Sequence, residues 1–277
     1  MSRIAKRSFG EFEITVINDG GLEFPSHVFP DVEENRLNGL LTDSGKTAIE
    51  TSFNVLHIRA GEESILVDTG AGAHFGPTAG FLQQALSEAA IHPEDVSRVV
   101  FTHLHPDHFG GSMTDDGHPV FANAELILTE TERRFWTDDA NFSGADANTI
   151  EWRRMGLDAL ECYGDRVSTK GAGGEVAPGV HLVDLPGHTK GHAGIRIDSG
   201  GTQFIYAADI LHAQDLQLAD PNLCAAFDAD KDQARATRNR TLDMLATDGI
   251  LISGAHFLDR FIGYVEHAAG GYRITPA

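Results

Sequence analysis

The chain has 277 residues, and its hydrophobic content of 41% is that of an ordinary globular core. Its formal net charge is −20, from 41 acidic and 21 basic residues. This charge argues against nucleic acid and anionic membranes as partners, because phosphate binding needs a basic surface. No apolar run reaches the length of a membrane span, and the N-terminal residues 1–14 lack the apolar stretch of a signal peptide. We expect a cytoplasmic protein with Cys162 and Cys224 as reduced thiols.

The first half of the chain is rich in predicted strands. Residues 12–19 alternate polar and apolar side chains and predict a strand, whereas residues 20–50 look irregular. Residues 52–70 predict a hairpin of two apolar strands around the turn Ala-Gly-Glu-Glu. Apolar spacing predicts a helix over 81–91, and residues 97–103 predict a short buried strand.

The second half continues with a strand that passes into a helix over 125–136. Residues 137–165 are polar and mostly helical, and we interpret them as a candidate lid. Three predicted strands follow at residues 180–188, 192–198 and 203–209. A helix at 231–246, a strand at 250–256 and an edge strand at 271–276 complete the order. Because no linker or low-complexity segment divides these elements, we expect one domain, 1–277, of two sheets covered by helices.

Polar side chains that can bind metals stand at the ends of four predicted buried strands. They are His103, His188, Asp209 and His256. A single histidine at a strand end is usually structural, so each of these alone would be weak. Strand ends can converge at one rim of a sheet and hold their side chains rigidly there. Four such endings beside one dense cluster of histidines therefore favour a metal site over a solvated loop.

That cluster lies in the sequence FTHLHPDHFGG, residues 101–111. Residues two apart in an extended loop point the same way, so His103 and His105 can face one cation together. Pro106 stiffens a turn that can direct Asp107 and His108 at a second position. Such groups are costly to bury without partners, which again favours a bound cation.

The strand ends and the cluster together supply seven candidate metal ligands: His103, His105, Asp107, His108, His188, Asp209 and His256. Three protein ligands leave an open position on a divalent ion for water. Seven ligands therefore suit two divalent ions, with one carboxylate shared between them. Imidazole and carboxylate without thiolate favour zinc, with manganese, iron and cobalt as alternatives.

The pattern His103-x-His105-x-Asp107-His108, followed by Gly187-His188, Asp209 and His256, resembles the metallo-β-lactamase superfamily. The resemblance runs from Asp68 of VDTG to His256. It implies an α/β fold, a four-layer αββα sandwich with the metals at one edge. It also implies that His103, His105 and His188 hold the first metal. Asp107, His108 and His256 would hold the second, and Asp209 would bridge the two.

Two more residues match the superfamily pattern. Asp68 corresponds to an aspartate behind the site, so we expect it to orient ligands, with a simple turn before Gly70 as the alternative. His192 of GHTKGH matches a second histidine common in that motif. For His192 we expect a structural hydrogen bond rather than ligation.

The ligand set also discriminates within the superfamily. Asp209 counts against β-lactam hydrolysis as the native task, and His105 stands where flavodiiron proteins place a carboxylate. RNA-processing members carry a basic exosite or an extra domain, which this acidic chain lacks. The C-terminal GGYRITPA lacks the basic cluster with which glyoxalase II recognises glutathione. Lactonases and the methyl parathion hydrolase branch remain. Residues 209–238 resemble the latter, with His212 where many acyl-homoserine lactonases have a tyrosine.

The resemblance implies a dinuclear metal-dependent hydrolase of lactones, carboxylic esters or aryl phosphotriesters. Two cations would lower the pKa of a shared water molecule from about 15.7 towards 7, and the resulting hydroxide would attack the substrate. Asp107 is a candidate for relaying a proton to the leaving group. His212 is a candidate catalytic residue, with a role in buttressing Asp209 or the substrate wall as the alternative.

Aromatic residues of the segments 22–30 and 135–152 are candidates for an apolar mouth that suits an acyl or aryl group. They are Phe24, Phe29, Phe135, Trp136, Phe142 and Trp152. Core packing or a dimer contact is the alternative for each, and analogy with the branch favours a homodimer.

Three alternative functions stay open: a glyoxalase II-like thioesterase, a β-lactamase, and a binding or regulatory module with vestigial activity. The last would lack a ligand or have a blocked pocket. Metal content and turnover separate a module from an enzyme.

Overall fold

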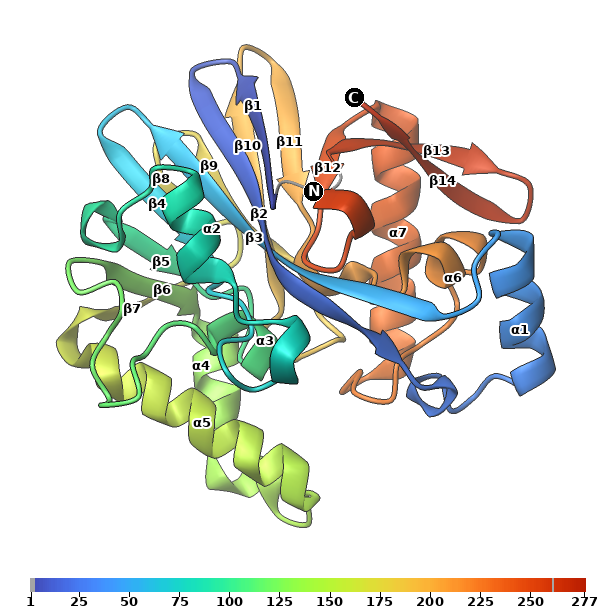
Figure 1. The fold of residues 1–277 in the computed structure, drawn as a ribbon, viewed down its shortest axis with the longest axis horizontal. Helices are drawn as coiled ribbons and strands as arrows, with labels where there is room; N and C mark the ends of the chain where they lie inside the picture. Colours follow the sequence, from blue (N-terminus) through green and yellow to red (C-terminus); the bar gives the residue numbers. More distant parts are fainter. Residues whose placement is uncertain (1–2, 261) are drawn as a thin grey trace.

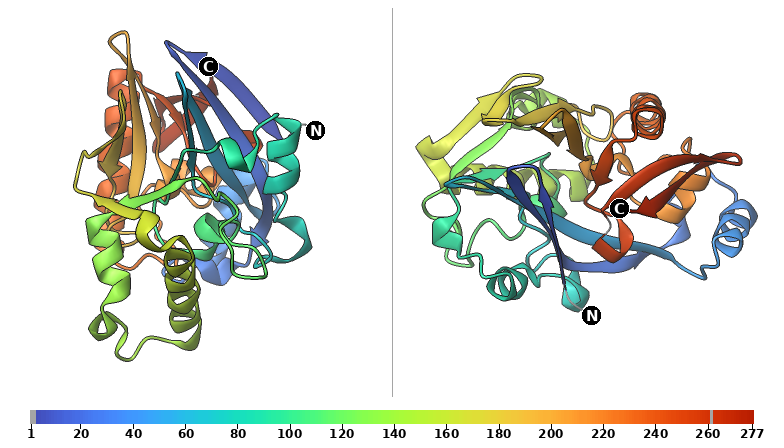
Figure 2. Two further views of the ribbon diagram at one scale, coloured as in Figure 1. Left: turned by 90° about the vertical axis from the view of Figure 1, so that its left-hand side faces the viewer. Right: turned by 90° about the horizontal axis from the view of Figure 1, so that it is seen from above.

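The computed structural model describes residues 3–260 and 262–277, which form two seven-stranded sheets with helices on their outer sides (Figures 1 and 2). This arrangement confirms the predicted αββα sandwich. The strands of the first sheet follow chain order, β1 to β7. They are β1 (Ile4–Phe9), β2 (Phe12–Phe24), β3 (Ile49–Ala60), β4 (Glu63–Val67), β5 (Arg98–Val100), β6 (Glu125–Thr129) and β7 (Val167–Lys170).

The second sheet has the reverse order, β14 to β8. Its strands are β8 (Glu175–Ala177), β9 (Val180–Asp184), β10 (Ala193–Ser199), β11 (Thr202–Tyr206), β12 (Leu251–Ser253), β13 (Gly263–Ala268) and β14 (Gly271–Pro276). Strands β4, β5 and β6 run parallel in the first sheet. Strands β9, β11 and β12 also share one direction, since β9 and β11 are both antiparallel to β10 and β12 is parallel to β11. The carboxyl ends of each group therefore meet at one edge of their sheet.

Helices flank the two sheets on their outer faces and around the edge where the strand ends converge. They are α1 (Glu34–Asp43), α2 (Leu82–Glu88), α3 (Pro106–Phe109), α4 (Glu130–Thr137), α5 (Ala147–Tyr163), α6 (Gln214–Ala219) and α7 (Lys231–Asp248). Leu86 of α2, Trp136 of α4 and Leu160 of α5 pack in one apolar cluster with the first sheet. Leu242 and Leu245 of α7 pack in another with the second sheet. Within the described residues, we find no helix long and apolar enough to cross a membrane.

The main core lies between the two sheets. Ile14 and Val16 of β2 join Ile195 and Ile197 of β10 and Phe204 of β11 in one buried cluster. Burying such a side chain contributes about 1.5–3 kcal/mol to stability. This rigid core fixes the strand ends from which the polar side chains project.

Residues 20–50 contain regular structure, so the prediction of an irregular segment is wrong. Strand β2 continues to Phe24, with a bulge between Asn18 and Gly20, and β3 already begins at Ile49. Gly20 has φ +130°, and a Cβ there would collide with backbone atoms of Thr78 and Ala79. Helix α1 also lies in this segment. Periodicity missed α1 because it buries only two residues, Leu37 and Leu41.

Several other elements differ from expectation. Pro106 begins a single helical turn, α3, within the histidine stretch. Strands β1, β7, β8 and β13 and helix α6 were not predicted, because they are short or only partly buried and lack a clear apolar pattern. The other predicted strands and helices are confirmed, including the mostly helical segment 137–165 and the edge strand β14.

Candidate metal centre

The four predicted strand-end residues meet at the edge where parallel strand ends converge. His103 follows β5, His188 follows β9, Asp209 follows β11 and His256 follows β12. All four side chains are buried, with exposed fractions of 0–3%. The rest of the histidine cluster joins them, because α3 turns Asp107 and His108 back towards Asp209.

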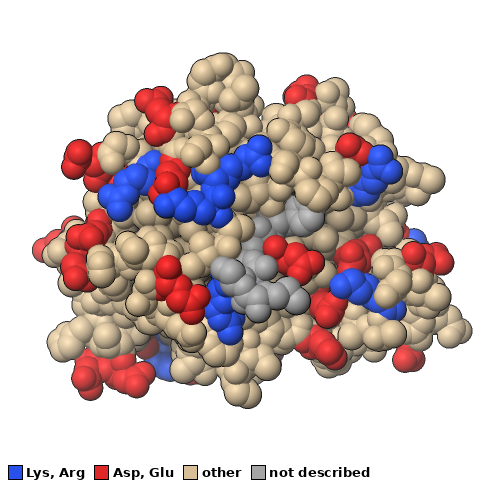
Figure 3. Space-filling model, turned by 45° about the horizontal axis from the view of Figure 1, so that its top comes forward, with Lys and Arg blue, Asp and Glu red and all other residues tan. Residues whose placement is uncertain are grey.

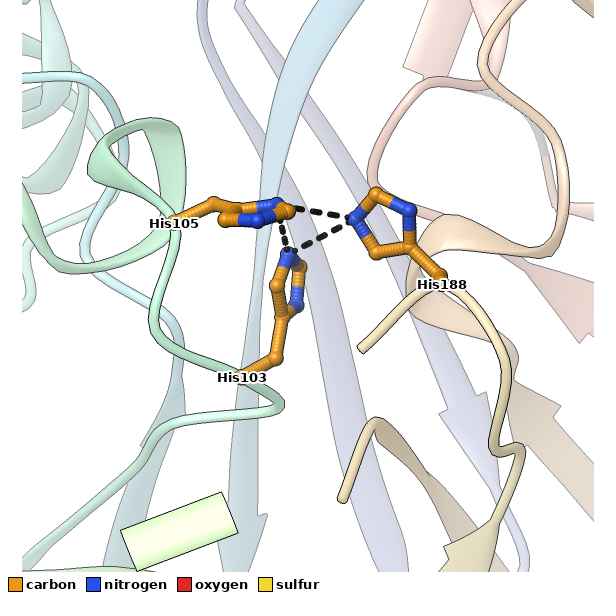
Figure 4. Close-up of side chains that lie close together, drawn as sticks. All are labelled: His103, His105 and His188. Atoms are coloured by element: carbon orange, nitrogen blue, oxygen red, sulfur yellow. Dashed lines mark hydrogen bonds between the residues drawn. The ribbon is translucent and has the colours of Figure 1, made fainter. Parts of the chain in front are cut away.

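Three imidazole nitrogens face a single point (Figure 4). The Nε2 atom of His103 lies 3.1 Å from Nδ1 of His105 and 3.2 Å from Nε2 of His188. The nitrogens of His105 and His188 lie 2.9 Å apart. Each hydrogen bond joins one donor to one acceptor. Three nitrogens that all contact one another cannot meet this condition at every pair, so hydrogen bonds alone do not account for all three contacts. Tetrahedral zinc with Zn–N bonds of about 2.0–2.1 Å would place its ligand nitrogens about 3.3 Å apart, which fits this triad.

A second group forms around Asp107, His108, Asp209 and His256, whose ligand atoms lie within 4.8 Å of one another. The Nε2 atom of His108 lies 3.2 Å from Asp209 and 3.5 Å from Asp107. His256 Nε2 lies 2.9 Å from Asp209 and 3.6 Å from Asp107. His108 Nε2 and Asp209 Oδ1 are both buried, and despite their 3.2 Å separation they lack hydrogen-bond geometry to each other or to any other described group. A buried imidazole nitrogen and a buried carboxylate oxygen of this kind suit the donor set of a divalent cation.

Asp209 touches both groups. Its Oδ2 atom lies 3.7 Å from His103 Nε2 and 3.4 Å from His188 Nε2, on the triad side. Its two oxygens also reach His256 and His108, on the other side. The carboxylate is thus placed between two candidate cation positions.

Hydrogen bonds behind the rings orient three of the histidines. His256 Nδ1 lies 2.8 Å from the carbonyl oxygen of Ser52, which can only accept, so Nδ1 carries a proton and Nε2 is the nitrogen that faces the carboxylates. His108 Nδ1 faces Asp68 at 2.8 Å, and His188 Nδ1 faces Asp228 at 2.9 Å. These partners favour the same tautomer in the other two rings.

Asp68 orients a candidate ligand, as predicted. One carboxylate oxygen accepts from the backbone N–H of Thr102 at 2.8 Å, and the other accepts from its hydroxyl at 2.9 Å. Asp68 therefore ties His108 to the end of β5.

His192 makes the structural hydrogen bonds that we expected. Its Nδ1 donates to the carbonyl of Leu185 at 2.7 Å, and its Nε2 accepts from the backbone N–H of Asp209 at 3.1 Å. Both nitrogens are thus engaged by the backbone, which leaves no lone pair for a cation.

A model of the metallo-β-lactamase superfamily matches residues 52–256. The chain belongs to this superfamily. It is similar to a probable metallo-hydrolase of Mycobacterium tuberculosis, 27% identical over 214 residues, which are 66% of this chain and 64% of that protein. The match thus spans less than two thirds of that relative's length. An N-acyl homoserine lactonase from a Bacillus species is 29% identical over 116 residues, or 41% of this chain and 38% of that protein.

Solved structures of the superfamily share the whole fold. The hydrolase AbOPH superposes with a TM-score of 0.94 at 26% identity, covering 100% of this chain and 98% of the other. AidC, described as a dizinc quorum-quenching lactonase, superposes with a TM-score of 0.92 at 24% identity, covering 99% and 97%. At that identity the likeness to AidC shows the fold alone.

The electrostatics of this superfamily site favour positive charge at the second group. Burial acts to lower the pKa of His108, but the carboxylates of Asp209, Asp107 and Asp68 together raise it well above its usual value. His256 behaves alike, since Asp209 and Asp107 outweigh burial and raise its pKa. Burial lowers the pKa of His103 well below its usual value, so that ring is neutral and able to coordinate. A cation at the second group would replace the protons that these carboxylates attract.

Two buried carboxylates near the site were missed from sequence. Asp228 accepts from His188 and also from the backbone N–H of Ala225 at 2.9 Å. Glu132 is completely buried in the first turn of α4. The only signal for Glu132 is the capping pattern Thr129-x-x-Glu132, since the Thr129 hydroxyl accepts from the Glu132 N–H at 3.1 Å. No pattern distinguishes Asp228 from other acidic residues.

His212 lies beside Asp209 and the triad. Its Nε2 atom is 3.3 Å from Asp209 Oδ2, and its ring centroid is 4.5 Å from that of His188 and 4.8 Å from that of Phe227. The side chain is buried, yet neither ring nitrogen has a hydrogen-bond partner. His212 lines the small cavity in front of the candidate metal centre.

That cavity of about 50 Å³ is walled by Phe24, Phe53, Phe75, Trp152 and Phe227 together with the polar site residues. A larger groove of about 490 Å³ adjoins it and shares His105, Trp152 and Phe227. Of the aromatic residues predicted to line a mouth, Phe24 and Trp152 line the cavity, while Phe135, Trp136 and Phe142 line the groove. Phe29 does neither, because it is buried in the cluster with α1. Sequence reasoning missed Phe53, Phe75 and Phe227.

Proposed function

We propose that the chain is a dinuclear metal-dependent hydrolase of small neutral lactones, carboxylic esters or aryl phosphotriesters. The observation that carries this proposal is the pair of ligand groups joined by Asp209. His103, His105 and His188 would hold one ion, and Asp107, His108 and His256 the other. Nitrogen and carboxylate donors without thiolate favour zinc, with manganese, iron and cobalt as alternatives. When bound, such ions supply Lewis acidity and lower the pKa of a bound water molecule from about 15.7 towards 7.

Residues of the chain itself would orient the substrate and move protons. Asp107 is partly exposed, with 15% of its side chain accessible, and it lines the cavity. Its carboxylate is therefore placed to pass a proton to a leaving group. The Asp209 carboxylate would balance the charge of both ions. His212, with two unpartnered nitrogens beside the cavity, would contact the reacting group or its leaving oxygen.

The walls of the site support an apolar, neutral substrate. Among the described residues that line the cavity and the groove there is no lysine or arginine. On the face shown in Figure 3, acidic side chains are spread widely, while basic side chains form one band at the upper left and a few separate groups elsewhere. An acidic surface repels phosphodiesters and nucleic acids. The similarity to an N-acyl homoserine lactonase gives further support to a lactone substrate.

A substrate panel tests this proposal. Zinc-loaded protein is offered an acyl lactone, an aryl ester, an aryl phosphotriester, a β-lactam and a glutathione thioester. We expect turnover of the lactone or the aryl ester, with phosphotriester hydrolysis as a second or main activity. Cleavage restricted to the β-lactam or the thioester would contradict the proposed substrate class and favour those alternatives. Full metal content without any turnover would favour a binding module.

The His212→Ala variant is expected to alter selectivity more than metal content. The change removes a ring from the cavity wall but none of the proposed ligands. We expect the ratio of kcat/KM values between lactone and phosphotriester to change about tenfold, which corresponds to about 1.4 kcal/mol of differential transition-state binding. Zinc content should remain that of the wild type.

His267→Ala is a matched control, because the side chain of His267 is 56% exposed and remote from the cavity. An unchanged substrate ratio in His212→Ala would show that His212 only fills space behind Asp209.

A further inference from the structure

Glu132 is a fully buried carboxylate that belongs to neither ligand group, yet it accepts four hydrogen bonds. The donors to Oε1 are the backbone N–H of Leu104 at 3.0 Å and the indole N–H of Trp136 at 2.6 Å. The donors to Oε2 are the hydroxyl of Thr189 at 2.7 Å and the backbone N–H of Gly191 at 2.9 Å. All of its partners are donors, so only a group that accepts at both oxygens satisfies them.

Two of the four donors adjoin residues of the histidine triad in the sequence. Leu104 stands between His103 and His105 in the segment after β5. Thr189 follows His188 in the segment between β9 and β10. The triad thus draws two nitrogens from the first sheet and one from the second, and Glu132 holds the backbones of both segments.

Trp136 connects Glu132 to the ring of His105, one of the candidate ligands. Its indole N–H is fixed by Glu132, and its ring meets His105 edge-on with centroids 5.9 Å apart. His105 is the one member of the triad that presents Nδ1 rather than Nε2. Trp136 therefore limits the rotation of the ring whose orientation differs from the other two.

We infer that Glu132 is a positioning residue that fixes the spacing of the three triad nitrogens and thereby sets the affinity of the ion held by His103, His105 and His188. This inference rests on the proposed function, since it requires that the triad hold an ion. Partners behind metal ligands typically change metal affinity about 10–100-fold when they are replaced.

The two segments have other connections that would keep the fold intact without this carboxylate. Ala193 N–H donates to the carbonyl of Thr102 at 3.0 Å, and the Thr129 hydroxyl donates to the carbonyl of Gly191 at 2.8 Å. These bonds hold the sheets together at the same edge. The expected effect of losing the carboxylate is therefore on the geometry of the triad rather than on the sandwich.

Glu132→Gln tests the inference, because the amide keeps the shape but turns one acceptor oxygen into a donor that faces other donors. Glu130→Gln is the matched control in the same helix, where the Glu130 side chain is 64% exposed and pairs with Arg134. Metal-free proteins are titrated with Zn²⁺ against a chromogenic chelator. We expect one of two bound ions to be held about 10–100-fold more weakly in Glu132→Gln, with the other ion unchanged. The control should match the wild type for both ions.

Thr189→Val gives a second test if Glu132→Gln does not fold, since it removes only one of the four donors. We expect a loss of about tenfold in the affinity of one ion. If the wild type binds two ions and a folded variant binds both with unchanged affinity, the inference is overturned. The proposed function then still stands. A lower thermal midpoint of the metal-free variant without a change in zinc affinity would overturn the inference too. Wild-type protein that binds no zinc would instead contradict the proposed function itself.

Discussion

Replacing Asp209 by asparagine is expected to lower kcat/KM about a hundredfold or more while the fold is retained. The carboxylate is 2% exposed and lies between the two ligand groups. In the proposed site its charge would allow two cations to lie close together, because a buried pair of positive charges repels strongly without a shared anion. Asparagine keeps the shape but carries no charge, and its amide nitrogen would face imidazole lone pairs.

Steady-state kinetics and metal analysis of the same Asp209→Asn preparation test this expectation. Asp232→Asn is a suitable control, because the side chain of Asp232 is 94% exposed and pairs with Arg235. We expect the control to match the wild type in both activity and zinc content. Unchanged turnover of Asp209→Asn with two ions bound would show that Asp209 does not bridge them.

Removing the metal ions with a chelator is expected to abolish turnover and to lower the free energy of unfolding. The loss amounts to about 4 kcal/mol for each site whose ion was present at about 1,000 times its dissociation constant. Its physical cause is the set of buried imidazoles and carboxylates, which without cations have fewer partners. Chemical denaturation with and without chelator measures the difference. Equal stability and equal turnover in both samples would contradict a metal-dependent enzyme.

The loss of unfolding free energy on metal removal should depend on pH, and the pKa of His108 sets the direction. In the metal-free chain, the pKa of His108 is raised above the unfolded value of 6.5. Its stabilising contribution is therefore fully present below 6.5 and is lost as the pH rises through the folded-state value. Metal binding displaces such protons, so affinity increases with pH. We therefore expect the stabilisation by metal to be larger at pH 8 than at pH 6.

The architecture and the candidate ligands could be predicted because both leave strong local signals. Apolar runs marked the central strands, and the spacing from His103 to His108 is specific to a known site. Other elements could not be predicted in the same way. Helix α1 presents only Leu37 and Leu41 to the core, and β8 is a three-residue strand, so neither has a readable period.

The surroundings of the site depend on contacts between distant segments. Glu132 and Asp228 are two of 41 acidic residues, and neither the capping pattern before Glu132 nor any pattern around Asp228 shows that they are buried beside the histidines. Phe53, Phe75 and Phe227 reach one cavity from three separate parts of the chain. The tautomer of His256 likewise depends on the carbonyl of Ser52, a residue far away in the sequence. These features result from tertiary packing, so no local sequence motif predicts them.

The number of metal ions per chain tests the central claim most directly. Metal-free protein is titrated with Zn²⁺ while bound zinc, measured by elemental analysis, and hydrolytic rate are followed together. The proposed site predicts that binding saturates near two ions per chain and that full activity requires both. A fully active preparation with one ion or none would contradict a dinuclear hydrolase.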